Sequence, residues 1–165
     1  MSLPPEIIRV LVIDDHPLFR RGVIQLLGST PHFKIIGEAE NGEQGFLQAL
    51  ALRPDLILLD LNMKGGMDGI ATLQKLQATD LESKIIILTV SDSPQDLISA
   101  IRAGAEGYLL KDTEPDQMLS QLHEVMFGRT VISKALTHYL AHALREDSLK
   151  SLRQPSELTE RENAI

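Results

Sequence analysis

The sequence predicts an α/β fold built on a five-stranded parallel sheet with helices on both faces. Five short aliphatic runs alternate with five segments of helical periodicity along the first 128 residues. Three of the runs are nearly continuous in apolar residues, which is typical of strands buried on both faces. Parallel strands need crossover connections, which helices supply. The compact arrangement of five such units is a doubly wound sheet with strand order 2-1-3-4-5.

The expected strands are the aliphatic runs, which are rich in Val, Ile and Leu and too short for typical helices. They are residues Arg9–Asp14, Lys34–Ala39, Asp55–Asp60, Lys84–Val90 and Gly107–Lys111.

The helices are expected between these runs, where apolar residues recur at helical spacing. The first begins at Pro17, because proline suits the first helical position. The second begins after Asn41, which would cap it, and Phe46, Ala49 and Leu50 are expected to face inward. The fifth ends near residue 128, and its inward face is expected to hold Leu119, Leu122, Val125 and Met126.

The chain outside the sheet divides into four segments around a domain at residues 8–128. Residues 1–7 are expected to be a tail, and residues 129–146 an additional helix with one apolar face. Residues 147–157 are polar with one proline, which indicates a linker. Residues 158–165 (LTERENAI) look like the opening of another helix, so we expect a truncated second domain there.

Composition narrows the range of functions. The 165 residues carry a net charge of −7, so the chain alone is expected to bind nucleic acid poorly. It has no cysteine, which excludes disulfides, thiolate metal sites and a cysteine nucleophile. No apolar run approaches the roughly 18 residues of a membrane span, and the N-terminus lacks the features of a signal peptide. We therefore expect a cytoplasmic protein with no membrane partner.

Polar residues gather where the expected strands end. In a doubly wound sheet, ligands bind beyond the carboxyl ends of the strands, where the strand order reverses. Here that point lies between the first and third strands. The residues at the strand ends are Asp14, Asp15, Asp60, Thr89 and Lys111.

Three carboxylates at one edge suggest a cation and phosphate chemistry. They would raise each other's pKa unless a cation joined them, and Mg²⁺ (or Mn²⁺) is the usual oxygen-bound ion where phosphate is handled. Asp60 closes the central strand and is the best candidate nucleophile, able to form an acyl phosphate. Lys111 would neutralise phosphoryl oxygens, and Thr89 would donate a hydrogen bond. The backbone carbonyl of Asn62 could complete the metal shell.

This pattern resembles the receiver domain of bacterial two-component response regulators. The resemblance covers about residues 8–128 and rests on Asp14-Asp15, Asp60, Thr89-Val90 and Gly107–Lys111 in order. The stretches VIDDHPLFRRGV, LLDLNMKG and GYLLKD resemble the NarL/FixJ subgroup, and LTERE at 158–162 is similar to the start of its LuxR-type helix-turn-helix domain. Two features depart from the usual receiver pattern: Asp112 replaces a proline, and the loop 63–69 is one residue longer.

The resemblance implies a flavodoxin-like receiver that is a phosphoacceptor switch, not an enzyme, and takes part in its own phosphorylation and dephosphorylation. A sensor histidine kinase would phosphorylate Asp60. The implied Mg²⁺ ligands are Asp15, Asp60 and the Asn62 carbonyl, with Asp14 in the outer coordination sphere. Thr89 and Tyr108 would form the switch. The other implied partner is promoter DNA, bound through the missing C-terminal domain; homodimerisation stays open.

Some of these residues also fit other classes of protein or site. A haloacid-dehalogenase-like phosphatase also uses a strand-end aspartate, Mg²⁺ and a lysine. It needs a second aspartate two residues after the nucleophile, and the amide of Asn62 cannot shuttle that proton. His138 and His142 are four residues apart on the expected helix and read as a surface pair. His16 reads as a helix-start residue near the pocket.

Overall fold

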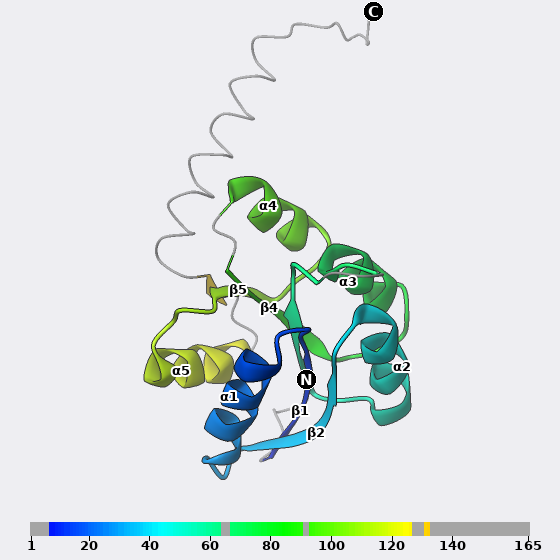
Figure 1. Ribbon diagram of the computed structural model, residues 1–165. Helices are drawn as coiled ribbons and strands as arrows, with labels where there is room; N and C mark the ends of the chain where they lie inside the picture. The colour runs from blue at the N-terminus through cyan, green and yellow to red at the C-terminus, as the bar shows by residue number, and fades with distance from the viewer. Residues whose placement is uncertain (1–6, 64–66, 91–92, 127–130, 133–165) are drawn as a thin grey trace, which may run out of the picture.

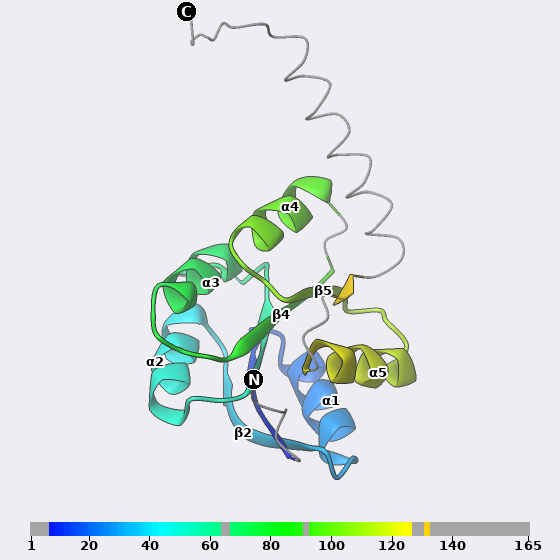
Figure 2. The ribbon, with the colours of Figure 1, turned by 180° about the vertical axis from the view of Figure 1, so that it is seen from behind.

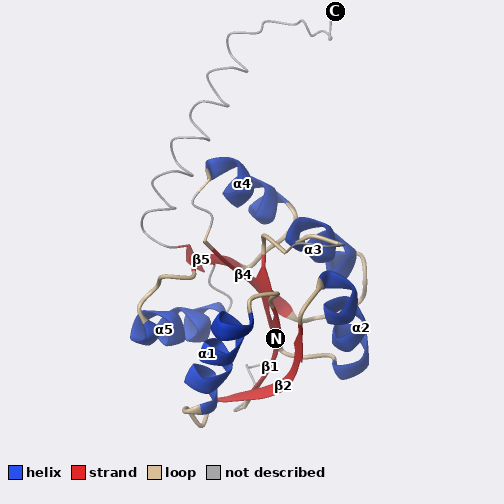
Figure 3. Ribbon diagram, in the orientation of Figure 1, coloured by secondary structure: helices blue, strands red, loops and turns tan. Residues whose placement is uncertain are grey.

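The computed structural model describes residues 7–63, 67–90, 93–126 and 131–132. These residues form one parallel sheet with helices packed on both faces (Figures 1 and 3). The strand order is β2-β1-β3-β4-β5-β6, which contains the predicted order 2-1-3-4-5. The strands are β1 (Ile8–Ile13), β2 (Phe33–Ala39), β3 (Leu56–Asp60), β4 (Lys84–Thr89), β5 (Gly107–Leu110) and β6 (Val131–Ile132).

The helices divide between the two faces of the sheet, as the views from front and back both show (Figures 1 and 2). Helices α1 (Pro17–Gly28) and α5 (Pro115–Met126) cover one face. Helices α2 (Gly42–Leu52), α3 (Gly69–Gln77) and α4 (Pro94–Arg102) cover the other. Each face has its own buried apolar cluster, so the central strands contribute side chains to both and read as continuous apolar runs.

A sixth strand extends the sheet beyond the five that the sequence predicts. Val131 and Ile132 pair in parallel with Gly107 and Tyr108 of β5. The prediction of an additional helix at 129–146 is therefore wrong at residues 131 and 132, which form a strand. The rest of the region predicted as a helix, the predicted linker and the expected start of a second domain, at residues 133–165, lie outside the described residues, as does the tail at 1–6.

The predicted starts of the first two helices are confirmed, and side chains cap α2 and α4. Pro17 opens α1. The Asn41 side chain accepts a hydrogen bond of 2.8 Å from the backbone N–H of Gln44 at the start of α2. Ser93 accepts one from the N–H of Asp96 at the start of α4. These contacts satisfy amide groups that have no partner within the helix.

The prediction that Leu50 faces inward is wrong, because 38% of its surface is exposed. The buried face of α2 is formed by small residues, Gly42, Gly45 and Ala49. A Cβ atom at Gly45 would lie 2.5 Å from a side-chain carbon of Ile13, so α2 packs directly against β1.

No helix among the described residues is both long and apolar enough to cross a membrane.

Candidate functional site

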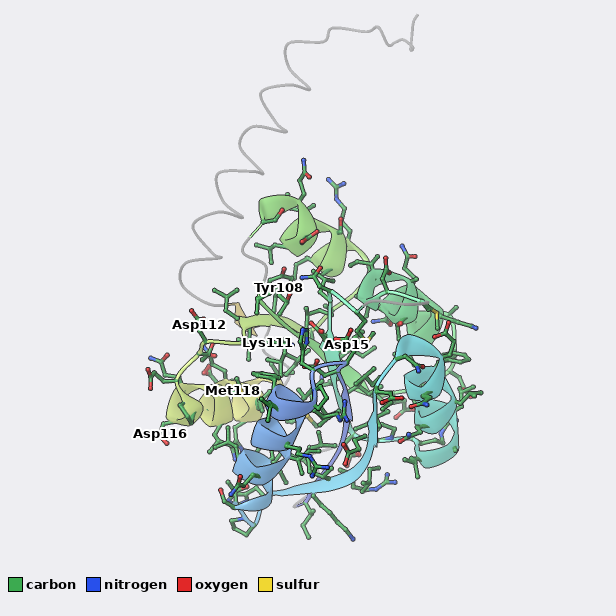
Figure 4. All side chains as sticks on the ribbon, in the orientation of Figure 1. Asp15, Tyr108, Lys111, Asp112, Asp116 and Met118 are labelled. Atoms are coloured by element: carbon green, nitrogen blue, oxygen red, sulfur yellow. The ribbon has the colours of Figure 1, made fainter. Side chains whose placement is uncertain are left out.

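The carboxyl edge of the sheet gathers all the polar side chains that the sequence predicts there. Asp14 and Asp15 follow β1, Asp60 ends β3, Thr89 ends β4 and Lys111 follows β5. Asp14, Asp60 and Thr89 are buried although they are polar or charged. Figure 4 shows Asp15 and Lys111 at this same edge, although they are far apart in the sequence. The predicted grouping is therefore confirmed as geometry.

Lys111 provides the positive charge of the site. Its Nζ lies 2.8 Å from Asp14 Oδ2 and 3.5 Å from Asp60 Oδ2, and its side chain is only 7% exposed. The backbone N–H of Lys111 donates to the Thr89 carbonyl at 2.8 Å, so β4 fixes where the lysine begins. A buried ammonium held between two carboxylates is placed to meet an incoming anion.

Asp60 combines deep burial with an oxygen available for chemistry. Only 2% of the residue is exposed. Its Oδ1 accepts a hydrogen bond of 3.3 Å from the Asn62 backbone N–H, whereas its Oδ2 accepts none from the described residues. A buried carboxylate oxygen without a hydrogen bond is costly unless a cation faces it.

The pKa of Asp60 is raised from 3.8 to about 6. Burial is the largest cause, and the negative charge of Asp14 adds to the rise. Lys111, the Asn62 N–H and His16 act in the opposite direction and lower the pKa. The sequence predicted a raised pKa from crowding of carboxylates. The crowding contributes, but removal of Asp60 from water is the larger cause.

Asn62 and Thr89 are joined by their side chains. The amide Nδ2 of Asn62 donates to Thr89 Oγ1 at 3.1 Å. This bond connects the loop after β3 to the end of β4, next to the Asp60 carboxylate. A group added to Asp60 would therefore meet a hydroxyl already oriented by a neighbour.

The turn that carries the paired aspartates is held from α1. The backbone N–H of His16 donates to Asp14 Oδ1 at 2.8 Å. The guanidinium of Arg20 donates to the Asp14 carbonyl oxygen at 2.6 Å and to Glu38 on β2 at 2.8 Å. These bonds fix the Asp14 carboxylate relative to the sheet.

Two contacts in the site were not found from the sequence. His16 is the N-cap residue of α1, as expected for a helix start, but its ring also lies against the three carboxylates. The second contact is that of Phe19 on α1, because Lys111 Nζ lies 4.5 Å from the centre of its ring. The signal for both was their position just after the aspartate pair on the helix facing the pocket.

Tyr108 is fully buried in the apolar cluster that includes Leu97 and Ala100 of α4. Its ring is therefore already inside the protein in this conformation. Asp112 and Asp116 are exposed and belong to the entry of α5, as expected for charges at a helix start (Figure 4).

The loop after Asp60 is packed tightly against the strand end. A Cβ atom on Gly69 would lie 2.5 Å from the Asp60 carbonyl oxygen and 2.5 Å from Leu61 Cα. The Glu43 carboxylate accepts a hydrogen bond of 3.2 Å from the Met67 N–H. Residues 64–66 of this loop, where the extra residue was expected, lie outside the described part of the chain.

The cluster suits a divalent metal ion. Ligand atoms of Asp14, Asp15, His16 and Asp60 all lie within 4.8 Å of one another. The donor set is dominated by carboxylate oxygens, which hard cations prefer. The Asp60 carboxylate has a second oxygen, Oδ1, which can face such an ion while Oδ2 stays available for reaction.

Comparison with protein families matches residues 10–123 to the response regulator receiver domain. The nitrate/nitrite response regulator NarL of Escherichia coli K12 is 47% identical over 156 residues, which cover 94% of this chain and 72% of that protein. The nitrate/nitrite response regulator NarP of the same strain is 46% identical over 132 residues, covering 80% and 61%. The local motifs had pointed to NarP, and the two relatives show nearly equal identity.

Solved structures agree with the sequence comparisons. The receiver domain of a response regulator named NarL from Mycobacterium tuberculosis superposes with a TM-score of 0.72 at 34% identity, covering 76% of this chain and all of that one. A LuxR-family response regulator from Aurantimonas gives a TM-score of 0.78 at 25% identity, covering 83% and 97%. The comparisons give no support to the phosphatase alternative.

Proposed function

This chain belongs to the response regulator receiver family, in its NarL/LuxR branch of DNA-binding transcription regulators, and we propose that Asp60 is its phosphoacceptor. One observation carries the proposal. Asp60 Oδ2 is buried, accepts no hydrogen bond from the described residues, and lies 3.5 Å from Lys111 Nζ. A nucleophilic oxygen and a cation are thus placed side by side at the reactive edge of the sheet.

In the proposed reaction, Asp60 Oδ2 attacks the phosphorus of a phosphohistidine on a sensor kinase. The new O–P bond forms as the P–N bond breaks, and the imidazole leaves with its electron pair. Lys111 moves its ammonium from the carboxylates to an oxygen of the transferred group. Thr89 donates its hydroxyl proton in a hydrogen bond to another oxygen. These residues give the domain its part in its own phosphorylation, and water later hydrolyses the acyl phosphate.

Asp15, Asp60 and the Asn62 carbonyl would hold the metal ion, and Asp14 would support it from the outer sphere. Mg²⁺ fits this oxygen-rich set, and when bound it would neutralise charge on the phosphoryl oxygens. We expect Asp15→Asn to remove Mg²⁺ binding and phosphorylation together. Normal phosphorylation of the wild-type protein in excess chelator would contradict the role of the metal.

Thr89 and Tyr108 form the proposed relay to the surface around α4, β5 and α5. A phosphoryl group would draw Thr89 towards Asp60 and away from Asn62. Because the Tyr108 ring is already buried, phosphorylation would hold it inside rather than draw it inwards. Thr89→Val should still be phosphorylated, but hydrogen exchange in α4 and α5 should then no longer change. If phosphorylation of Thr89→Val still changed hydrogen exchange in α4 and α5 as it does in the wild type, the signal would travel by another route.

The proposed partners are a sensor histidine kinase and promoter DNA. NarL extends beyond the region matched by this chain, which spans 72% of its length. DNA binding is assigned to a domain that follows Leu158, and the function places the protein in the cytoplasm with its DNA target. The net charge of −7 opposes contact of the receiver with phosphates. A gel shift at physiological salt should show specific DNA binding for a chain extended beyond Ile165 and none for these 165 residues.

The test of the phosphoacceptor is a mass measurement after incubation with a small phosphodonor and Mg²⁺. The wild-type chain should gain one phosphoryl group, and Asp60→Asn should gain none. Asp80→Asn is the matched control, because Asp80 is exposed and far from the site in sequence. Stoichiometric labelling of the Asp60→Asn variant would refute the assignment. Multiple turnover of a generic phosphate ester would instead favour a phosphatase.

A further inference from the structure

The imidazole of His16 lies within the carboxylate cluster. Its Nδ1 is 3.0 Å from Asp14 Oδ1, 3.1 Å from Asp15 Oδ1 and 3.4 Å from Asp60 Oδ2. About half of the side chain is exposed, so the ring forms the outer wall of the pocket. One nitrogen from α1 therefore faces carboxylates from both β1 and β3.

These separations are those of neighbouring ligands around one metal ion. Nitrogen and oxygen ligands bind Zn²⁺ at about 2.0–2.2 Å, which places two of them about 3.0 Å apart at a right angle and about 3.4 Å apart at a tetrahedral angle. The three distances from His16 Nδ1 span this range. The nitrogen therefore needs little movement to become a ligand alongside the carboxylates.

Asp60 provides an independent indication of a ligand at this point. Its side chain is 99% buried, and its Oδ2 accepts no hydrogen bond from the described residues although it is turned towards the His16 ring. Such an oxygen gains most from direct coordination to a cation. Asp60 and His16 thus face the same small volume.

The chemistry of the donor set depends on whether His16 takes part. Carboxylates and carbonyls alone suit Mg²⁺, whereas an imidazole favours later first-row ions such as Zn²⁺, Ni²⁺ and Cu²⁺. We propose that His16 joins Asp15 and Asp60 in a second binding mode of this metal site, one that holds late first-row divalent ions. This inference builds on the metal site of the proposed function and adds a ligand and a class of ion to it.

The second mode has a consequence for phosphorylation. The ion would occupy Asp60 Oδ2, the oxygen assigned to attack phosphorus, and would block its reaction. Lys111 Nζ lies 3.0 Å from His16 Nδ1 and would give up that contact when the ion binds. It would keep its 2.8 Å contact with Asp14 Oδ2. An ion that binds His16 Nδ1 would thus inhibit phosphorylation, whereas Mg²⁺, which does not use this nitrogen, would support it.

Pulsed electron paramagnetic resonance with Cu²⁺ tests the nitrogen ligand directly. The chain has five histidines, so a variant with glutamine in place of the other four leaves His16 as the sole imidazole. One equivalent of Cu²⁺ should show coupling to an imidazole nitrogen in this variant, and the coupling should vanish when His16→Gln is added. Absence of nitrogen coupling in the folded single-histidine variant would overturn the proposal.

Calorimetric titration of the wild type and His16→Gln provides a second test that needs no other substitution. The affinity for Zn²⁺ should fall about tenfold or more, as expected when a metal-binding shell is disrupted, while the affinity for Mg²⁺ stays nearly the same. Equal losses for both ions, or no loss for Zn²⁺, would overturn the inference. Failure of Mg²⁺-dependent labelling at Asp60 in the wild type would instead remove the proposed function itself.

Discussion

Replacement of Asp60 by asparagine should make the protein more stable at neutral pH. The carboxylate is buried at the end of β3, and its burial is the main reason why its pKa rises from 3.8 to about 6. At neutral pH the folded protein must therefore keep a charge that would be better hydrated in the unfolded chain. The amide of asparagine removes this charge and keeps an oxygen that can accept the hydrogen bond from the Asn62 N–H.

The size of the effect follows from the pKa difference. A rise from 3.8 to about 6 corresponds to about 3 kcal/mol, because each pKa unit is worth about 1.4 kcal/mol. Between these two values the folded protein binds more protons at Asp60 than the unfolded chain does. The contribution of Asp60 to stability is therefore lost as pH rises from 3.8 through about 6. Below 3.8 the carboxyl is protonated in both states, and the penalty disappears.

Urea unfolding in the presence of a chelator measures this difference. At pH 7.5 the free energy of unfolding of Asp60→Asn should exceed that of the wild type by about 3 kcal/mol. At pH 3.5 the two proteins should be nearly equally stable. A variant that is no more stable at pH 7.5, or whose advantage is the same at both pH values, would refute the burial argument.

The control is Asp80→Asn, because the Asp80 side chain is 87% exposed and forms a surface ion pair with Arg53. Its effect on the free energy of unfolding should stay within about 0.5 kcal/mol.

Mg²⁺ provides a further check, because a ligand that binds only the folded state adds to stability. It should stabilise the wild type and should stabilise Asp60→Asn much less.

Three further substitutions test other contacts. Phe19→Leu removes the ring beside Lys111 and should slow phosphorylation about fivefold, the equivalent of about 1 kcal/mol of cation–π contact, while Phe19→Tyr should restore the rate; equal rates in all three proteins would exclude the contact. Gly69→Ala should destabilise the fold by about 1–3 kcal/mol, because the added Cβ would meet backbone atoms at 2.5 Å. Gly22→Ala is the control in urea unfolding and should not destabilise the fold, because its Cβ meets nothing within 4 Å. Tyr108→Ala should lower the free energy of unfolding by about 3–5 kcal/mol because of the cavity it leaves, and Tyr108→Phe should lower it much less. Thermal unfolding measures both, and similar losses would contradict the packing role of the ring.

The sheet and the gathering of the site residues could be predicted because both follow from simple patterns. Strands buried on two faces read as unbroken apolar runs, and the carboxyl ends of parallel strands meet at one edge. The topology alone places Asp14, Asp60 and Lys111 at one edge, so their grouping could be predicted without knowledge of side-chain conformations. Their roles in phosphorylation were inferred from the chemistry of these side chains at that edge and from the family resemblance, and they stay predictions.

The features that were missed depend on packing rather than on periodicity. The inward face of α2 was assigned to Phe46, Ala49 and Leu50. Ala49 is buried as predicted, but Gly42 and Gly45 form the rest of the buried face, and Leu50 is 38% exposed. The ring contacts of His16 and Phe19 depend on rotamers, which spacing does not determine. The strand β6 is two residues long, too short to give a recognisable run.

The short strand β6 gives the sheet an unusual mechanical property. Tyr108 lies opposite Ile132 in the parallel register, so the strand that carries the proposed switch residue also carries the anchor of the segment that follows. Backbone pairing resists sliding along the strand, because each step of slip breaks the hydrogen-bond ladder. A shift of β5 along its axis would thus displace Ile132 as well. The motion would reach Ile132 through peptide groups, so side-chain substitutions on α5 should leave this coupling between β5 and β6 intact.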